Sequence, residues 1–258
     1  MRIMFVMTLL IASIFPIQMS AQKALSGLTV IIDPGHGGSD PGSSRVHGET
    51  RINESTYTYD VSLRVAKLIR EHGGIAHLTI KDTTKMITSP ANKISGRSMS
   101  ARFTFDNSPV HAGSKGLRKR VAFGNLMARK FPKSRIVWIS IHFDVVGNLT
   151  ETSGVRIIAA DSMNAVARGL VKSFDDSHRL RARNPFVESG DPRYGIRDLY
   201  VLSSRNIIRN RVLIELGNFN NDGDAWKIRS PEVRDSYAQT IVRGLGQRTS
   251  TFIVQRRR

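Results

Sequence analysis

The sequence predicts a single α/β domain whose mostly parallel sheet is covered by helices on both faces. Short runs of apolar, β-branched residues alternate along the chain with segments whose apolar residues recur at helical spacing. The strand-like runs are continuously apolar, which is typical of parallel strands buried on both sides. The chain of 258 residues shows no internal repeat and no domain boundary, so we expect one hydrophobic core.

The first elements form a strand–helix–strand unit. Residues 28–32 are the first apolar run, and the glycine-rich residues 37–50 are expected to be loop. A helical pattern begins at Glu54, and the residues expected on its buried face are Val61, Val65, Leu68 and Ile69. Two glycines end this helix before a strand over residues 75–80. Such a unit implies two parallel strands joined by a right-handed crossover.

The next segment, residues 81–116, is polar, rich in Ser and Thr, and without clear periodicity. A loop of that length is unusual inside a compact domain, so we interpret it as a functional insertion. The remaining elements are expected in the following order: a helix over 117–129 with Val121, Leu126 and Met127 inward, a strand ending at His142, a strand over 155–159, a helix over 164–173, a basic loop over 179–197, strands over 199–202 and 211–216, a final helix from Ser230 to Leu245, and a basic tail over 250–258.

The N-terminus reads as a secretory signal peptide over residues 1–21. One positive charge precedes a mostly apolar run over residues 3–17, and small and polar residues follow. An uncleaved membrane anchor is the alternative, but the run is short for a bilayer, which takes roughly 20 residues. We therefore expect a periplasmic or secreted protein, with no membrane span after the signal is removed.

Composition excludes several classes of function. Cysteine is absent, so the chain has no disulfide, thiol nucleophile or thiolate metal ligand. The net charge of +18 would usually suggest nucleic acid. Export and the lack of interleaved aromatic and basic residues argue against that partner. The excess positive charge is concentrated in residues 91–135, where Asp106 is the only acidic residue. Two interpretations stay open, a solubilising surface or attraction to an acidic, immobile polymer.

Four polar residues stand where the predicted sheet would place a site. His36, His142 and Glu215 each follow or end a strand-like run, and Glu54 begins the helix after the first strand. The carboxyl ends of parallel strands meet at one edge, so we expect these side chains to converge. Two imidazoles and a carboxylate can hold zinc with a position left for water, and a second carboxylate can act as base. This pattern predicts a metal-assisted hydrolase.

Each of these residues also has a structural explanation when taken alone. His142 could be a hydrogen-bonded core residue, and Glu54 could simply favour the helix dipole. Glu215 is harder to explain structurally, because a carboxylate at the end of a buried strand needs a partner. His47, in the glycine-rich loop, is the one serious spare ligand.

Taken together, the motifs resemble a known family. Residues 33–42 read Asp-Pro-Gly-His-Gly-Gly-Ser-Asp-Pro-Gly, and a glutamate-initiated helix, Ser-Ile-His and Val-Leu-Ile-Glu-Leu-Gly follow in that order. This is similar to the zinc-dependent N-acetylmuramoyl-L-alanine amidases of the division and sporulation type, over about residues 25–245. The resemblance implies a twisted six-stranded sheet, and one catalytic domain over residues 22–258. It also implies one Zn²⁺ per chain, held by His36, Glu54 and His142.

The same resemblance implies an activity. Glu215 would be the catalytic base, and the bond cut would be the amide between N-acetylmuramic acid and L-alanine in peptidoglycan. The role would be wall remodelling or cell division. Arg118 and Arg120 could meet carboxylates of the stem peptide. A protein activator is a further candidate partner, because the insertion over 81–116 could block the zinc until it is moved.

Three rivals stay open at this point. The first is a zinc peptidase that cuts within the stem peptide. The second is a catalytically silent envelope-binding protein that uses its basic surface to hold the wall. The third is a non-haem iron protein, since two histidines and one carboxylate also suit Fe(II).

Overall fold

The computed structural model describes residues 24–84, 94, 99–133, 135–145, 150–183, 186–191 and 198–255. The expected signal peptide, residues 1–21, lies outside the described residues and stays a prediction. Among the helices that are described, none combines the length and the apolar character needed to cross a bilayer.

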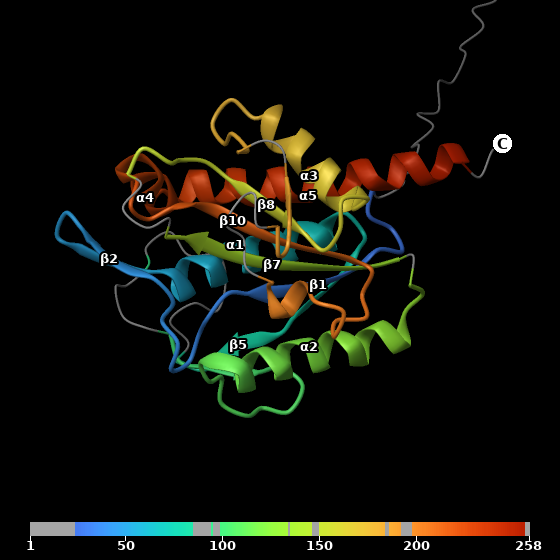
Figure 1. Cartoon of the computed structure of the whole chain (residues 1–258), viewed down its shortest axis with the longest axis horizontal. Helices are drawn as coiled ribbons and strands as arrows, with labels where there is room; N and C mark the ends of the chain where they lie inside the picture. The colour runs from blue at the N-terminus through green and yellow to red at the C-terminus, as the bar shows by residue number, and fades with distance from the viewer. Residues whose placement is uncertain are drawn as a thin grey trace, which may run out of the picture.

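The centre of the molecule is a six-stranded sheet with the order β4-β1-β7-β10-β8-β9 (Figure 1). Its strands are β1 (Thr29–Pro34), β4 (Ile75–Leu78), β7 (Ile136–Asp144), β8 (Arg156–Ala159), β9 (Val187–Glu188) and β10 (Asn210–Asn218). The neighbours from β4 to β10 are parallel, and β8 runs antiparallel to β10. The predicted fold class, a mostly parallel six-stranded sheet, is confirmed.

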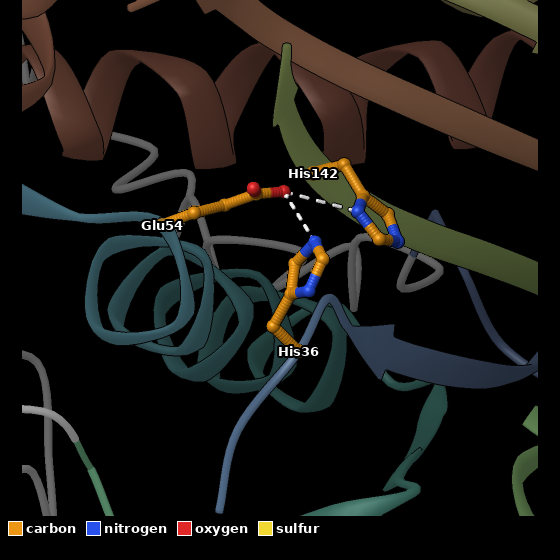
Figure 2. A group of neighbouring side chains, drawn as sticks. All are labelled: His36, Glu54 and His142. Atoms are coloured by element: carbon orange, nitrogen blue, oxygen red, sulfur yellow. Dashed lines mark hydrogen bonds and ion pairs between the residues drawn. The ribbon is translucent and has the colours of Figure 1, made fainter. Parts of the chain in front are cut away.

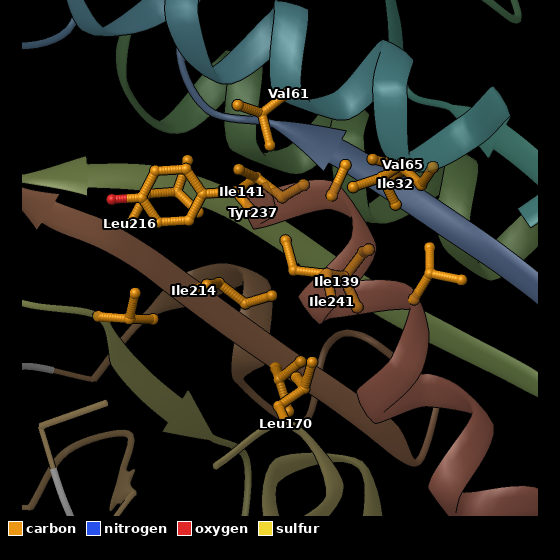
Figure 3. Packing of buried hydrophobic residues seen from close by; sticks show 14 of the residues in the cluster. Ile32, Val61, Val65, Ile139, Ile141, Leu170, Ile214, Leu216, Tyr237 and Ile241 are labelled. Carbon is orange, nitrogen blue, oxygen red and sulfur yellow. The ribbon is translucent and has the colours of Figure 1, made fainter. Parts of the chain in front are cut away.

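Helices cover both faces of this sheet. The helices α1 (Glu54–Glu71), α3 (Ala165–Asp175) and α5 (Pro231–Gln255) lie on one face, and α2 (Gly113–Lys130) lies on the other (Figure 1). Successive side chains of β7 point to opposite faces of the sheet, so this strand contributes to both cores. Ile139 and Ile141 belong to the core under α1, α3 and α5, and Trp138 belongs to the core under α2. Figure 3 shows the first of these cores, where Ile139 and Ile214 of the sheet meet side chains of the three helices.

The loop expected over residues 37–50 is partly a β-hairpin. Strand β2 (Ser44–His47) pairs antiparallel with β3 (Thr50–Asn53), and Gly48 turns the chain with φ of 60°. The hairpin ends directly at Glu54, so it leads the chain into α1. The glycine and serine content hid this strand pair, because only Val46 and Ile52 mark it as extended.

The insertion over 81–116 also has structure where it is described. Strand β5 (Ile80–Asp82) pairs antiparallel with β6 (Ala101–Phe103), and a third apolar cluster forms there. That cluster contains Tyr59, Ile80, Met99, Ala101, Phe103 and Val110. The apolar residues are too widely spaced in sequence to show a period, so only the fold reveals that they share one core.

Three further expectations were wrong, and one helix was missed. Residues 199–202 form no strand, because Tyr200–Leu202 is the 3₁₀ helix η2, which buries Val201 and Leu202 beside α2. Helix α4 (Asp222–Arg229) was not predicted, although Asn221 caps it by accepting a hydrogen bond from Asp224 N. Leu126 is 42% exposed instead of buried. The final helix continues past Leu245 to Gln255, into the expected tail.

Candidate metal centre

The loop after β1 presents His36 in an unusual backbone conformation. His36 has φ of 63°, a left-handed geometry that few residues other than glycine adopt. Two glycines make room for the imidazoles. A Cβ on Gly42 would lie 2.7 Å from the His36 ring, and a Cβ on Gly35 would lie 2.6 Å from His142 Nδ1. The glycine-rich motif is therefore required by close packing around the two histidines.

Glu54 lies between the two histidines at the first residue of α1 (Figure 2). Its Oε1 atom is 3.0 Å from His36 Nε2 and 3.1 Å from His142 Nδ1. The backbone N–H of Phe143 donates to Oε1, and that of Ser43 donates to Oε2 at 2.9 Å. The Glu54 side chain is only 4% exposed. Both carboxylate oxygens are thus fixed before anything else binds.

The three groups can hold one metal ion. One ligand atom from each of His36, Glu54 and His142 lies within 4.8 Å of the other two. Two imidazole nitrogens and a carboxylate oxygen form a donor set that divalent metals favour. The imidazole rings are 25% and 21% exposed, so the cluster is open to solvent on the side of the histidines. The sequence predicted this convergence, and the fold brings these three residues together.

The charges of the cluster favour a cation. Burial alone would lower the pKa of His36, but its hydrogen bonds to Asp40 and Glu54 outweigh burial and raise that pKa to about 10. Burial would raise the pKa of Glu54, yet contacts with His142 and His36 lower it overall. A site that holds an extra proton this firmly has a negative field, and a metal cation would replace the proton.

Asp40 is a candidate site residue that the sequence analysis did not single out. Its Oδ2 atom lies 3.0 Å from His36 Nδ1, on the opposite side of the ring from Glu54, and Gly42 N donates to its Oδ1. A carboxylate behind a metal-ligating histidine fixes the orientation of the ring. Its position, four residues after His36 in the same motif, was the available signal.

A buried ion pair supports the His36 loop from below. Arg120 of α2 donates to Asp33 Oδ1 at 2.6 Å, to Pro34 O at 2.6 Å and to His36 O. Asp33 also accepts hydrogen bonds from Thr79 and Ser140. Arg120 is therefore unavailable to substrate, which corrects the expectation that it could meet a stem-peptide carboxylate.

Part of the insertion packs behind the same loop. Gly38 N donates to Met99 O at 3.1 Å, and Ser39 N donates to Val110 O at 3.4 Å. A Cβ on Gly37 would contact Ile80 at 3.0 Å. The described part of the insertion therefore supports the loop that carries His36. Residues 85–93 and 95–98 lie outside the description, so a blocking role for the insertion stays a hypothesis.

Glu215 lies beside the cluster but is not part of it. Strand β10 places Glu215 in register with His142 of β7, so the two side chains are neighbours on one face of the sheet. The Oε2 atom of Glu215 is buried without a hydrogen-bond partner. Burial, reinforced by the charges of Asp144 and Glu54, raises the pKa of Glu215 well above its ordinary value. The side chain of His47, the spare ligand, lies outside the description.

A cavity of about 540 Å³ adjoins the cluster. It is lined by Ser43, Ser44, Arg45, Val145, Thr150, Phe219 and Asn220. Ser43 is the residue whose N–H donates to Glu54, so one lining residue contacts the cluster. Arg45 reaches from the hairpin to Asp222 at 2.6 Å and ties the hairpin to α4 across this space.

The fold and this cluster define an α/β domain with a candidate metal-binding group at the carboxyl edge of its sheet, an arrangement that metal-dependent hydrolases use. The family model described as N-acetylmuramoyl-L-alanine amidase matches residues 30–247. The chain belongs to this family, and the predicted family is confirmed.

Curated relatives are consistent with that assignment. An uncharacterised cell wall amidase of Bacillus anthracis is 29% identical over 86% of this chain and 35% of its own length. The germination-specific N-acetylmuramoyl-L-alanine amidase of Bacillus subtilis is 24% identical over 86% of this chain and 79% of its own length. The chain therefore spans about a third of the first relative and most of the second.

Solved structures share the fold. An N-acetylmuramoyl-L-alanine amidase of Nostoc punctiforme is 22% identical with a TM-score of 0.57, covering 85% of this chain and 95% of its own. The CwlD amidase of Clostridioides difficile, in complex with the GerS lipoprotein, is 18% identical with a TM-score of 0.58, covering 87% and 99%.

Proposed function

We propose that this protein is a zinc-dependent amidase that hydrolyses the bond between N-acetylmuramic acid and L-alanine in peptidoglycan. One observation supports the proposal most strongly. In a chain of the amidase family, His36, Glu54 and His142 come from three separate segments and converge beside Glu215, whose buried Oε2 atom has no hydrogen-bond partner among the described residues.

His36, Glu54 and His142 would hold the zinc ion. Three protein ligands leave a position for water or substrate, and the partial exposure of both imidazoles matches an open site. When bound, zinc polarises the scissile carbonyl and lowers the pKa of the attacking water. Asp40 and the Arg120–Asp33 pair keep the His36 ring in place.

Glu215 is the residue that would move the proton. It would accept a proton from the attacking water and deliver it to the nitrogen of the leaving amine. Its buried, unpartnered Oε2 atom and raised pKa suit a group that must hold a proton transiently near neutral pH. The register of Glu215 with His142 supports a position of that carboxylate beside the zinc ligands, where the scissile bond would lie.

The surroundings fit an exported enzyme that acts on a polymer. The cavity of about 540 Å³ beside Ser43 offers room for an extended chain. Residues 1–21 would direct export to the periplasm or the exterior, and residues 22–258 would be the catalytic domain. A protein activator is part of the proposal, since the CwlD relative was solved with a lipoprotein.

The test is digestion of purified peptidoglycan by the mature protein with zinc, with a chelator, and as Glu215→Ala. Mass spectrometry identifies the products. Free stem peptides that begin with L-alanine, made only by the zinc-loaded parent, would support the proposal. Cleavage elsewhere in the peptide would identify a peptidase instead, and wall binding without any product would identify a silent binder.

A further inference from the structure

A group of charged residues lies on the side of Glu215 that faces away from the metal ligands. Strand β8 runs antiparallel to β10, and this pairing puts Arg156 directly opposite Glu215. Residues opposite each other in such a ladder point to the same face of the sheet, with Cβ atoms about 5 Å apart. The row therefore runs from His142 through Glu215 to Arg156.

Arg156 has no assigned task in the fold. Its side chain is partly exposed, and among the described residues it makes no hydrogen bond and no ion pair. An arginine carries five N–H donors in a planar fork. An arginine held on a strand beside a catalytic carboxylate, with that fork free, is in a position to bind an anion.

A second arginine lies behind the first. Arg183 follows the bridge between Val155 and Ala182 and donates from Nε to Gly154 O at 3.0 Å. Its two terminal nitrogens are buried and have no hydrogen-bond partner in the described structure. Its charge is paired with Asp144 at 3.7 Å, but leaving buried donors without hydrogen bonds is costly, so these donors favour an additional acceptor.

Three carboxylates, those of Asp144, Asp224 and Glu215, interact electrostatically with Arg183. Asp144, two residues after His142 on the same strand, lies 3.7 Å from Arg183 and interacts electrostatically with Arg156. It accepts no hydrogen bond from either guanidinium. These carboxylates offset the charge of the arginines, but among the described residues the guanidinium N–H groups of Arg156 and the terminal nitrogens of Arg183 donate no hydrogen bond, so they remain available to an anion.

The proposed reaction indicates which part of a substrate would lie near Arg156 and Arg183. Under the proposed function, Glu215 delivers a proton to the leaving amine, which belongs to the stem peptide. The leaving peptide therefore lies toward Glu215, and the arginines beyond Glu215 face that peptide. Stem peptides carry carboxylates, which guanidinium groups bind through paired, charge-assisted hydrogen bonds.

We propose that Arg156, backed by Arg183, forms a subsite for a carboxylate of the stem peptide, so that the enzyme prefers acidic stem peptides to amidated ones. This inference rests on the proposed function. The alternative is that the two arginines only offset the charge of Asp144 and Glu215.

The experiment compares two soluble muramoyl peptides that differ only in one group, a free carboxylate or its carboxamide. We expect the zinc-loaded parent to cleave the acid with a kcat/KM about ten- to a hundredfold higher, as for a hydrogen bond to a charged group. Arg156→Ala should reduce that ratio to near one by raising the KM for the acid, and Arg156→Lys should restore part of it. Arg129→Ala, on an exposed turn of α2, should leave the ratio unchanged.

Two outcomes would overturn the inference while the proposed function stands. One is equal cleavage of both substrates by the parent. The other is an equal loss on both substrates in Arg156→Ala, which would show that the arginine only balances charge. If the parent cleaves neither substrate, calorimetry can measure the affinity of the protein for the two free stem peptides and test the subsite without turnover. About tenfold tighter binding of the acid, lost in Arg156→Ala, supports the subsite, and equal binding refutes it.

Discussion

The two sides of the candidate site differ in how their polar groups are satisfied. On the side of β1 and α1, Glu54 has four polar contacts, and Asp33 accepts hydrogen bonds from Arg120, Thr79 and Ser140. On the side of β10 and β8, the Oε2 atom of Glu215 and the terminal nitrogens of Arg183 are buried without hydrogen-bond partners.

The difference separates two tasks. A fully paired network fixes the geometry of its side chains before any ligand arrives. Breaking it is costly because it leaves a buried charge without its partner. Unpaired groups raise the energy of the free protein and are satisfied when substrate or a proton arrives. We therefore expect substitutions on the first side to change folding and metal binding, and those on the second to change turnover and selectivity.

The largest expected effect separates the two glutamates. Glu215→Gln should lower kcat by about 10²–10⁴, the contribution typical of a general base, with zinc affinity unchanged. Glu54→Gln should weaken zinc binding by more than about a hundredfold, since even the loss of a partner behind a ligand costs 10–100-fold. Metal analysis after dialysis, together with turnover of peptidoglycan, measures both. Loss of zinc in Glu215→Gln would contradict the proposed division between a metal-binding side and a catalytic side.

The next effect concerns folding. Arg120→Ala leaves the buried carboxylate of Asp33 without its cation, with only the hydroxyls of Thr79 and Ser140 as donors, which should cost about 3–5 kcal/mol in the free energy of unfolding. Arg156→Ala removes no ion pair and should change it by about 0.5 kcal/mol or less. Chemical denaturation measures both values.

A matched control for Arg120→Ala exists elsewhere in the fold. Arg234 of α5 pairs with Asp60 of α1 at 2.7 Å, and both side chains are fully buried. Arg234→Ala should also lower the free energy of unfolding, although Asp60 keeps Arg64 as a partner at 2.8 Å. Only Arg120→Ala should also weaken zinc binding by the folded protein, because only Arg120 contacts the loop of His36. Equal zinc affinity in the two variants would show that Arg120 does not support zinc binding through the loop of His36.

Much of the site was predictable because its residues are tied to strand ends. His36, His142 and Glu215 follow continuous apolar runs, and in a parallel sheet such positions meet at one edge. Asp40 and the Arg156–Arg183 pair were not predictable in the same way. Asp40 lies in a loop, where no period exists. Arg156 faces Glu215 only because β8 is antiparallel to β10. The direction in which a strand pairs cannot be inferred from the residues of that strand alone.

The fold shows the same division between local and tertiary information. The helix from Glu54 was predictable since its apolar residues share one face, and Val61, Val65 and Ile69 are buried. The strand expected at residues 199–202 was wrong, because four residues carry too little periodicity to separate a strand from a 3₁₀ turn. The cluster around Met99 and Phe103 was missed, since its members meet only through tertiary packing.

A smaller effect should appear as a pH dependence on the paired side. In the metal-free protein the pKa of His36 is raised from 6.5 to about 10. The stabilisation from its charged form is therefore fully present below about pH 6.5 and is lost as pH rises toward 10. Denaturation of the metal-free protein should show this decline. Zinc should remove it, because a metal-bound imidazole is already deprotonated.

Calorimetry in buffers of different ionisation enthalpy gives an independent measurement of the same event. Zinc binding near pH 8 should release about one proton from His36. A binding reaction that releases no proton, or a stability of the metal-free protein that is flat between pH 6.5 and 10, would show that His36 is neutral before the metal binds.

The smallest expected effect lies outside both sides of the site, on the surface of α2. Lys115, Arg118, Arg129 and Lys130 are exposed along this helix, and its sequence contains no acid. If this charge holds the protein on an acidic wall, binding to purified sacculi should weaken as salt rises, because exposed charges are screened beyond about 8–10 Å at physiological ionic strength. Lys115→Glu with Lys130→Glu should weaken binding at low salt and have little effect at high salt. Turnover of a soluble muramoyl peptide should stay unchanged, since neither residue contacts the cluster. Binding that does not respond to salt would assign these residues to solubility alone.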